Sequence, residues 1–259
     1  MTIPFLCTFD LLSPAGGKES PRDWDHSGIG LDRYASMVLR YACIPTIFVT
    51  GEAARAHAPL IDELLQRGAE VGLLVAPHQR TNGTKRAHMG VLTALQQAEA
   101  VAGALQLFQH ALGFRPTIVR TGLYSGNSAT YEILSQAYFT HASFRMPGAA
   151  LPVIGTVWPL DASIHVQHGL VDVPVTTEPE EKLFNRFPLY FAAEISTADT
   201  HKRLLHRGKA NGVVCLTGGT NADYWDAQGS SLRALEHILE AATEDTDLTP
   251  LRLSAVKGI

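Results

Sequence analysis

Residues 67–78, RGAEVGLLVAPH, contain a helix stop, a buried strand and a polar strand end in one short stretch. Gly68 predicts the end of a helix, because glycine is favoured just after the last helical turn. Residues 69–76 form a mostly apolar run, which is typical of a strand that is buried on both faces. Pro77 and His78 close the run, and in α/β proteins the polar residues just beyond such strands are candidate site residues.

The same alternation of helix and strand extends along the chain. Apolar runs rich in Val, Ile and Phe predict strands at 3–9, 45–50, 69–76, 116–120, 169–175 and 212–216. Apolar residues at three- and four-residue spacing predict helices that begin at Leu31 and lie over 59–68, 91–113, 128–137, 197–208 and 230–244. This alternation predicts an α/β fold with a mainly parallel sheet, closed or open. Since no linker or repeat interrupts it, we expect a single domain over residues 1–259.

Composition excludes several classes of function. The chain has 259 residues, with 46% hydrophobic and 18% charged residues and a formal net charge of -4, so a nucleic-acid surface is not expected. Cys7, Cys43 and Cys215 are far apart and form no CxxC pair, which favours buried thiols over disulfides or a cysteine zinc site. No signal peptide and no membrane-spanning apolar run is recognisable, so we expect a cytoplasmic protein.

Four polar residues follow predicted strands. They are Asp10, His78, Arg120 and Thr217. Each could serve as a local cap or a structural side chain on its own. Because the carboxyl ends of parallel strands meet at one edge of the sheet, their joint occurrence predicts a site there.

Several stretches together resemble one family. FLCTFD (5–10), RGAEVGLLVAPH (67–78), GFRPTIVRTG (113–122) and GLVDVPVTTEP (169–179) resemble the NodB-homology polysaccharide deacetylases, carbohydrate esterase family 4, in the same order over roughly residues 3–220. The resemblance implies a distorted (β/α) barrel of the polysaccharide deacetylase type. It also implies a divalent metal, usually zinc, used to remove acetyl groups from N-acetylated sugars.

The resemblance also implies residue roles, of which some are kept. Asp10 matches the catalytic base, and Arg120 matches the arginine that holds this aspartate. Of the family's metal ligands, His78 is the one histidine left in its stretch.

At other positions of the family's motifs, this chain has residues that cannot bind a metal or act as the general acid. Leu11 stands where the family has a metal-binding aspartate, and Leu74 and Ala76 stand in the histidine stretch. Thr217 stands at the place of the histidine that acts as general acid, and a hydroxyl does not replace an imidazole in that role at neutral pH. Leucine has no donor atom, so the metal site is degenerate, and leucines in it would make it apolar and dry.

Candidate substrate-binding residues surround the predicted site. His141 is expected at the same mouth, with a hydrogen bond to Arg120 or Asp10. The full set of substrate-binding candidates is His26, His141, Tyr124, Thr217 and Trp225. The expected ligand is a glycan or a small-molecule sugar, and a protein partner in polysaccharide biosynthesis is compatible with the same role.

Three hypotheses follow, in this order. In the first, the protein keeps the sugar cleft and has lost zinc-dependent deacetylation, with no cofactor. In the second, it is an active amide hydrolase or deacetylase in which Asp10, His78 and the 23–26 segment rebuild a site for zinc or another divalent metal. In the third, Asp10 acts as a base without a metal, its pKa raised by apolar neighbours.

Overall fold

The structure is a computed structural model. It describes residues 2–12, 21–77, 88–178, 188–192, 194, 197–219 and 229–258, with 21–23 described as backbone only.

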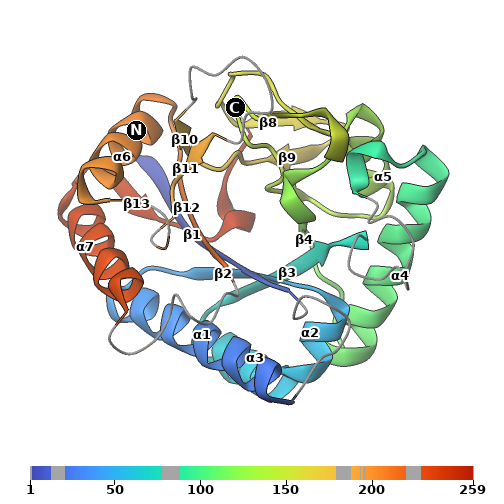
Figure 1. Cartoon of the computed structure of the whole chain (residues 1–259), viewed down its shortest axis with the longest axis horizontal. Helices are drawn as coiled ribbons and strands as arrows, with labels where there is room; N and C mark the ends of the chain where they lie inside the picture. The colour runs from blue at the N-terminus through green and yellow to red at the C-terminus, as the bar shows by residue number, and fades with distance from the viewer. Residues whose placement is uncertain are drawn as a thin grey trace.

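A curved, mainly parallel sheet forms the centre of the molecule (Figure 1). Within the described residues its strand order is β12-β1-β2-β3-β4-β5-β9-β8, and β13 pairs with β1 on the side. All of these pairs are parallel except β8 with β9. The strands are β1 (Ile3–Leu11), β2 (Pro45–Val49), β3 (Glu70–Val75), β4 (Ile118–Thr121), β5 (His141–Ala142), β8 (His165–Gln167), β9 (Leu170–Asp172), β12 (Val214–Gly219) and β13 (Leu248–Pro250). The expected (β/α) barrel with mainly parallel strands is therefore confirmed, in its distorted form.

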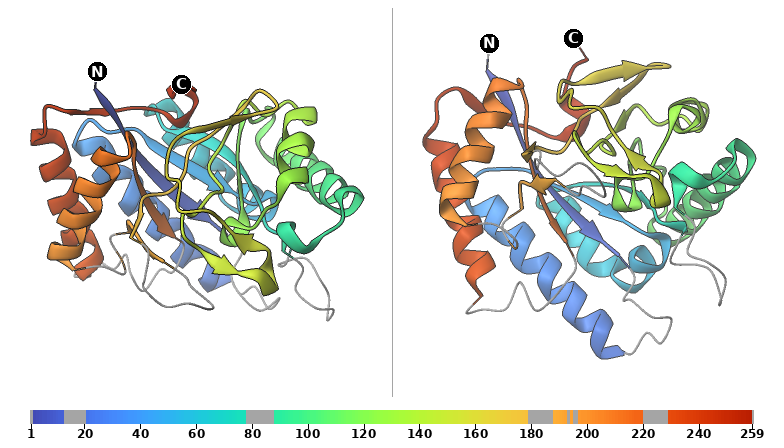
Figure 2. Two further views of the ribbon diagram at one scale, coloured as in Figure 1. Left: turned by 90° about the horizontal axis from the view of Figure 1, so that it is seen from above. Right: turned by 45° about the horizontal axis from the view of Figure 1, so that its top comes forward.

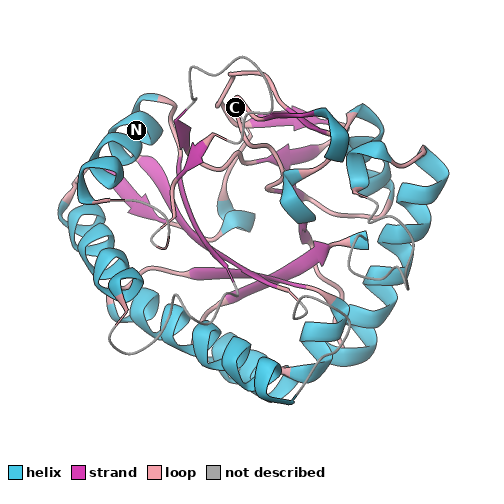
Figure 3. Ribbon diagram, in the orientation of Figure 1, coloured by secondary structure: helices cyan, strands magenta, loops and turns pink. Residues whose placement is uncertain are grey.

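Helices surround this sheet on its outer side (Figure 3). They are α1 (Pro21–Arg40), α2 (Gly51–Ala56), α3 (Ala58–Gln66), α4 (Ala94–Leu112), α5 (Ser128–Gln136), α6 (Ala198–Ala210) and α7 (Ser230–Glu244). Figure 2 shows that the two ends of the chain lie on the same side of the molecule. No helix in the described ranges is long and apolar enough to cross a membrane.

Short elements complete the described chain. The 3-10 turns are η2 (Met89–Val91), η3 (Gly122–Tyr124), η4 (Pro152–Ile154) and η6 (Leu253–Ala255). Two small antiparallel pairs join β6 (Ala150–Leu151) with β7 (Thr156–Val157), and β10 (Thr177–Glu178) with β11 (Leu189–Tyr190). These two-residue strands are too short to leave a periodic signal in the sequence.

Local capping explains where several helices begin and end. Thr93 and Gln96 form a capping box at the start of α4, and Gly113 closes that helix with a φ of 74°. Asn127 caps α5.

The first helix corrects a prediction. Residues 21–30 are helical, so α1 begins at Pro21 and not at Leu31. Two glycines lower the helix propensity of this segment, but tertiary contacts override that preference. Ser27 is buried, and its hydroxyl lies 2.8 Å from Nε2 of His57. The segment that was expected to be a loop is therefore the start of a packed helix.

The two faces of β1 separate the core into an outer and an inner layer. Phe5, Phe9 and Leu11 belong to a cluster that includes the apolar faces of the helices, while Leu6 belongs to a second cluster. Asp10 lines a cleft instead of joining the outer cluster. Because successive side chains of a strand point to opposite faces, Asp10 shares the inner face with Leu6.

Candidate functional site

A small cleft lies at the carboxyl ends of the central strands. Its volume is about 170 Å³. The register places Asp10 beside Gly219, and Leu74 beside Arg120, on neighbouring strands. The residues that line the cleft are Asp10, Leu12, Leu74, Gly122, Leu123, Tyr124, Tyr190, Glu194, Thr217, Gly218 and Gly219.

An ion pair between Asp10 and Arg120 forms the polar centre of this site. Nη1 of Arg120 donates to Oδ1 of Asp10 over 2.7 Å and to Oγ1 of Thr217 over 3.3 Å. The Arg120 side chain is fully buried, whereas Asp10 remains 18% exposed. The structure therefore brings together three of the residues that the sequence places at strand ends.

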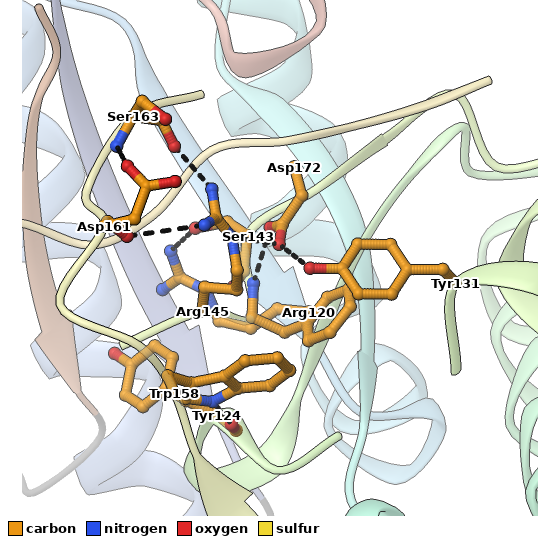
Figure 4. A network of polar contacts seen from close by, with 10 residues as sticks. Arg120, Tyr124, Tyr131, Ser143, Arg145, Trp158, Asp161, Ser163 and Asp172 are labelled. Carbon is orange, nitrogen blue, oxygen red and sulfur yellow. Dashed lines mark hydrogen bonds and ion pairs between the residues drawn. The ribbon is translucent and has the colours of Figure 1, made fainter. Parts of the chain in front are cut away.

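Other groups orient the Arg120 guanidinium. Its Nε donates to the backbone carbonyl of Ser143 over 2.9 Å, and its Nη2 donates to the Ser143 hydroxyl over 2.8 Å. Figure 4 shows Arg120 near Ser143 and Tyr124. The guanidinium carbon lies 4.3 Å from the ring centroid of Phe48 and 5.4 Å from that of Tyr124. With its donors directed and its faces covered, Arg120 has one fixed geometry toward Asp10.

Burial and charge act in opposite directions on this pair. Burial disfavours the charged form of Arg120, but Asp10 and its other neighbours raise the pKa of the guanidinium above its ordinary value. Burial raises the pKa of Asp10, and Arg120 opposes this rise. Burial also raises the pKa of Tyr124 well above its ordinary value, so its hydroxyl stays protonated.

Glu194 is a site residue that the sequence analysis did not single out. It lines the same cleft, and its Oε2 is buried without a hydrogen-bond partner in the described structure. Burial raises the pKa of Glu194 to about 8, and the charge of Asp10 adds to the rise. Glu194 follows Phe191 and Ala192, a short apolar run that the analysis did not take as a strand. Ala192 forms a parallel bridge with Thr217, so an acid at the end of this run was the signal that was missed.

Leucines form one wall of the cleft, although not the two that were expected. Leu74 lines it and is almost fully buried, as expected for an apolar site. Leu11 does not line it, because it points to the opposite face of β1 and packs with the outer cluster. Leu12 lines the cleft instead.

Two of the substrate-binding candidates lie in the cleft. Tyr124 and Thr217 both line it, and their hydroxyl oxygens are 3.4 Å apart. Trp225 and the metal-ligand candidate His78 lie outside the described residues.

The other two candidates lie elsewhere. The expected hydrogen bond from His141 to Arg120 or Asp10 is wrong, because its Nε2 lies 2.9 Å from the carbonyl oxygen of Val256 and its Nδ1 lies 3.0 Å from the hydroxyl of Thr140. His141 pairs with Ile118, at the start of β4, whereas Arg120 lies nearer the other end of that strand.

His26 lies in α1, outside the lining of the cleft, next to an exposed Asp25. The helix therefore replaces the loop that was to supply a rebuilt metal site. Within the described residues, no three His, Cys, Asp or Glu side chains are grouped so that they could hold a metal ion.

A second buried network centres on Asp172 (Figure 4). Oδ2 of Asp172 accepts from Nε of Arg145 over 3.0 Å and from the Tyr131 hydroxyl over 2.9 Å. Oδ1 of Asp172 accepts from the backbone N–H of Phe144 over 3.2 Å. Arg145 also donates to the backbone carbonyls of Asp161 and Ser163, so this network ties the 161–163 segment to β9.

Solved structures show a closely similar arrangement of the chain. A Mycobacterium smegmatis protein, assigned as a polysaccharide deacetylase, is similar to this chain with a TM-score of 0.68 and 16% identity, covering 98% of this chain and 88% of that one. The protein has the fold of the polysaccharide deacetylases. A Pseudomonas aeruginosa protein, also assigned as a polysaccharide deacetylase, is similar to this chain with a TM-score of 0.61 and 13% identity. The match covers 96% of this chain and 88% of that one.

The neighbours of this deacetylase fold include a pseudoenzyme. A mutant of a carbohydrate esterase family 4 pseudoenzyme from Bacillus anthracis, with restored enzymatic activity, has a TM-score of 0.54 and 10% identity, covering 95% of this chain and 64% of that one. No model of a protein family and no curated protein matches the chain. Since one fold can hold different chemistry, the activity has to be argued from the cleft.

Proposed function

We propose that this protein binds a carbohydrate in the cleft and does not carry out zinc-dependent deacetylation. The observation that carries this proposal is the mixed lining of the cleft. The Asp10–Arg120 pair is present there, and Leu74 lines the same cleft, where the resemblance places a metal-binding stretch. A polar pair thus lies at the cleft, while the position that the resemblance assigns to a metal-binding stretch is apolar.

The described residues do not fit a catalytic zinc. Such a site needs about three protein ligands and one open position for water. Leu74 has no donor atom, and among the described residues no three His, Cys, Asp or Glu side chains are grouped so that they could hold the ion. The proposed function therefore uses no metal.

The remaining lining suits a sugar. Small-molecule sites combine apolar and aromatic walls with a few polar groups that set the orientation of the ligand. Tyr124 and Tyr190 supply two rings with centroids 6.5 Å apart, and Gly218 and Gly219 line the same cleft without side chains. The likeness to polysaccharide deacetylases supports a carbohydrate as the ligand class.

Titration calorimetry on metal-free protein tests the binding. The probes are N-acetylated chito-oligosaccharides, their de-N-acetylated counterparts and unsubstituted cello-oligosaccharides. We expect saturable binding that is lost in Tyr190→Ala and kept in Tyr138→Ala, because Tyr138 is 78% exposed and lies outside the cleft. Absence of binding across the panel contradicts the proposal.

Metal analysis by mass spectrometry tests the loss of zinc chemistry. Wild type and His78→Ala are purified without chelator, soaked in zinc and desalted, and we expect background zinc in both. Near-stoichiometric zinc that disappears in His78→Ala shows a rebuilt metal site and overturns this part of the proposal.

A further inference from the structure

The Glu194 carboxyl has two oxygens in different surroundings. The backbone N–H of Gly219 bonds to the carboxyl, and Oε1 lies 3.8 Å from the position that a Cβ on Gly219 would occupy. Oε2 is buried and has no partner in the described structure. One oxygen of the carboxyl therefore lies near the backbone of Gly219, and the other has no partner among the described residues.

Backbone hydrogen bonds hold Phe191, three residues before Glu194, from both sides. The N–H of Phe191 donates to the carbonyl of Thr176 over 2.8 Å, and the N–H of Thr217 donates to the carbonyl of Phe191 over 2.9 Å. On the neighbouring strand, Gly219 stands opposite Asp10. Glu194 thus lies beside Asp10 at the end of β12, and both side chains line the cleft.

Glu194 and Asp10 differ in what balances their charge. Arg120 donates directly to Asp10, so this pair is neutral overall. Glu194 has no such cation among its described contacts, and a buried carboxylate without one is unfavourable. The neutral acid avoids that penalty and carries a proton that it can donate.

We infer that Glu194 acts as a neutral carboxylic acid that donates a hydrogen bond to an uncharged oxygen of the ligand, next to the Asp10–Arg120 pair. The inference rests on the proposed carbohydrate binding and adds a specificity-determining residue to it. The cleft then favours ligands that offer an amide carbonyl or hydroxyl oxygen, and it disfavours cationic amines.

Other ionisable groups near Glu194 do not account for the same behaviour. Asp10 is bound to Arg120, which remains charged, and burial raises the pKa of Tyr34 and Tyr124 well above their ordinary values. These tyrosines therefore stay protonated near neutral pH. Among the described residues, Tyr190 is the remaining ionisable side chain of the cleft lining.

Binding of tetra-N-acetyl-chitotetraose, measured by calorimetry at about pH 6 and about pH 9, tests the inference. A required proton with a pKa near 8 costs wild type roughly tenfold in affinity for each pH unit above that value. Glu194→Gln keeps an N–H donor of the same reach, so we expect it to bind at both pH values. We expect Glu194→Ala to bind weakly at both, and Glu178→Gln, a change outside the cleft, to follow wild type.

Two outcomes overturn the inference while carbohydrate binding stands. If Glu194→Gln loses binding as strongly as Glu194→Ala at about pH 6, the residue acts through a negative charge. If wild-type affinity is the same at both pH values, no proton on Glu194 is required.

A measurement without ligand separates this inference from the proposed function. If wild type binds no sugar, the infrared difference spectrum between wild type and Glu194→Gln at about pH 7 still reports on the proton. A band of a neutral carboxylic acid that only wild type shows supports the inference, and a carboxylate band in its place overturns it.

Discussion

The protonation of Glu194 should appear directly in the stability of the fold. Its folded pKa is about 8, against an ordinary value of 4.5, so between these values the folded protein keeps a proton that the unfolded chain releases. The stabilisation that this proton gives is complete below the pKa of Glu194 in the unfolded chain. It is lost as the pH rises through the pKa of Glu194 in the folded protein. Glutamine carries no titrating proton, so Glu194→Gln removes this dependence.

The expected size follows from the pKa displacement. One pKa unit corresponds to about 1.4 kcal/mol, so a rise from about pH 5 to about pH 8 could cost up to about 4 kcal/mol. Because water reaches part of the side chain, we expect about 2–3 kcal/mol, or roughly 4–12 °C in melting temperature.

Thermal and urea unfolding between about pH 5 and pH 8 measure this effect. Relative to wild type, Glu194→Gln should become more stable as the pH rises. Glu178→Gln is the matched control, because Glu178 is partly exposed and its ion-pair partner Arg203 is 54% exposed. If the curves of wild type and Glu194→Gln run parallel over the whole range, the burial argument for Glu194 is refuted.

Two further substitutions test the packing around the site by thermal and urea unfolding. Asp172→Asn should lower the free energy of unfolding by about 3 kcal/mol, because it leaves the buried guanidinium of Arg145 without its counter-charge. A loss below about 1 kcal/mol, the size expected for an exposed ion pair, contradicts this prediction. Gly90→Ala should cost about 1–3 kcal/mol, because the added Cβ would clash with the backbone carbonyl of Gly155 and push η2 from η4. A Gly90→Ala protein with wild-type stability shows instead that the two turns separate without cost.

Local sequence determined the framework of this protein. The apolar run over 69–76 is long enough to predict a buried strand, and the structure has β3 there. The capping residues Asn127 and Gly113 mark helix ends because they act through contacts within a few residues. Strand ends likewise mark Asp10 and Arg120 as site residues, since all parallel strands of a sheet point their carboxyl ends to one edge.

Tertiary structure decided the chemistry of the cleft. The ion pair of Asp10 and Arg120 joins residues 110 positions apart, and the burial that raises the pKa of Glu194 comes from segments that only the folded chain brings together. The two-residue period of β1 directs Leu11 away from the cleft and leaves Leu12 to line it. Burial and charge pairing depend on these distant contacts, because each is set by the whole environment of a group, whereas the alternation along β1 is local and only the fold decides which of its faces meets the cleft.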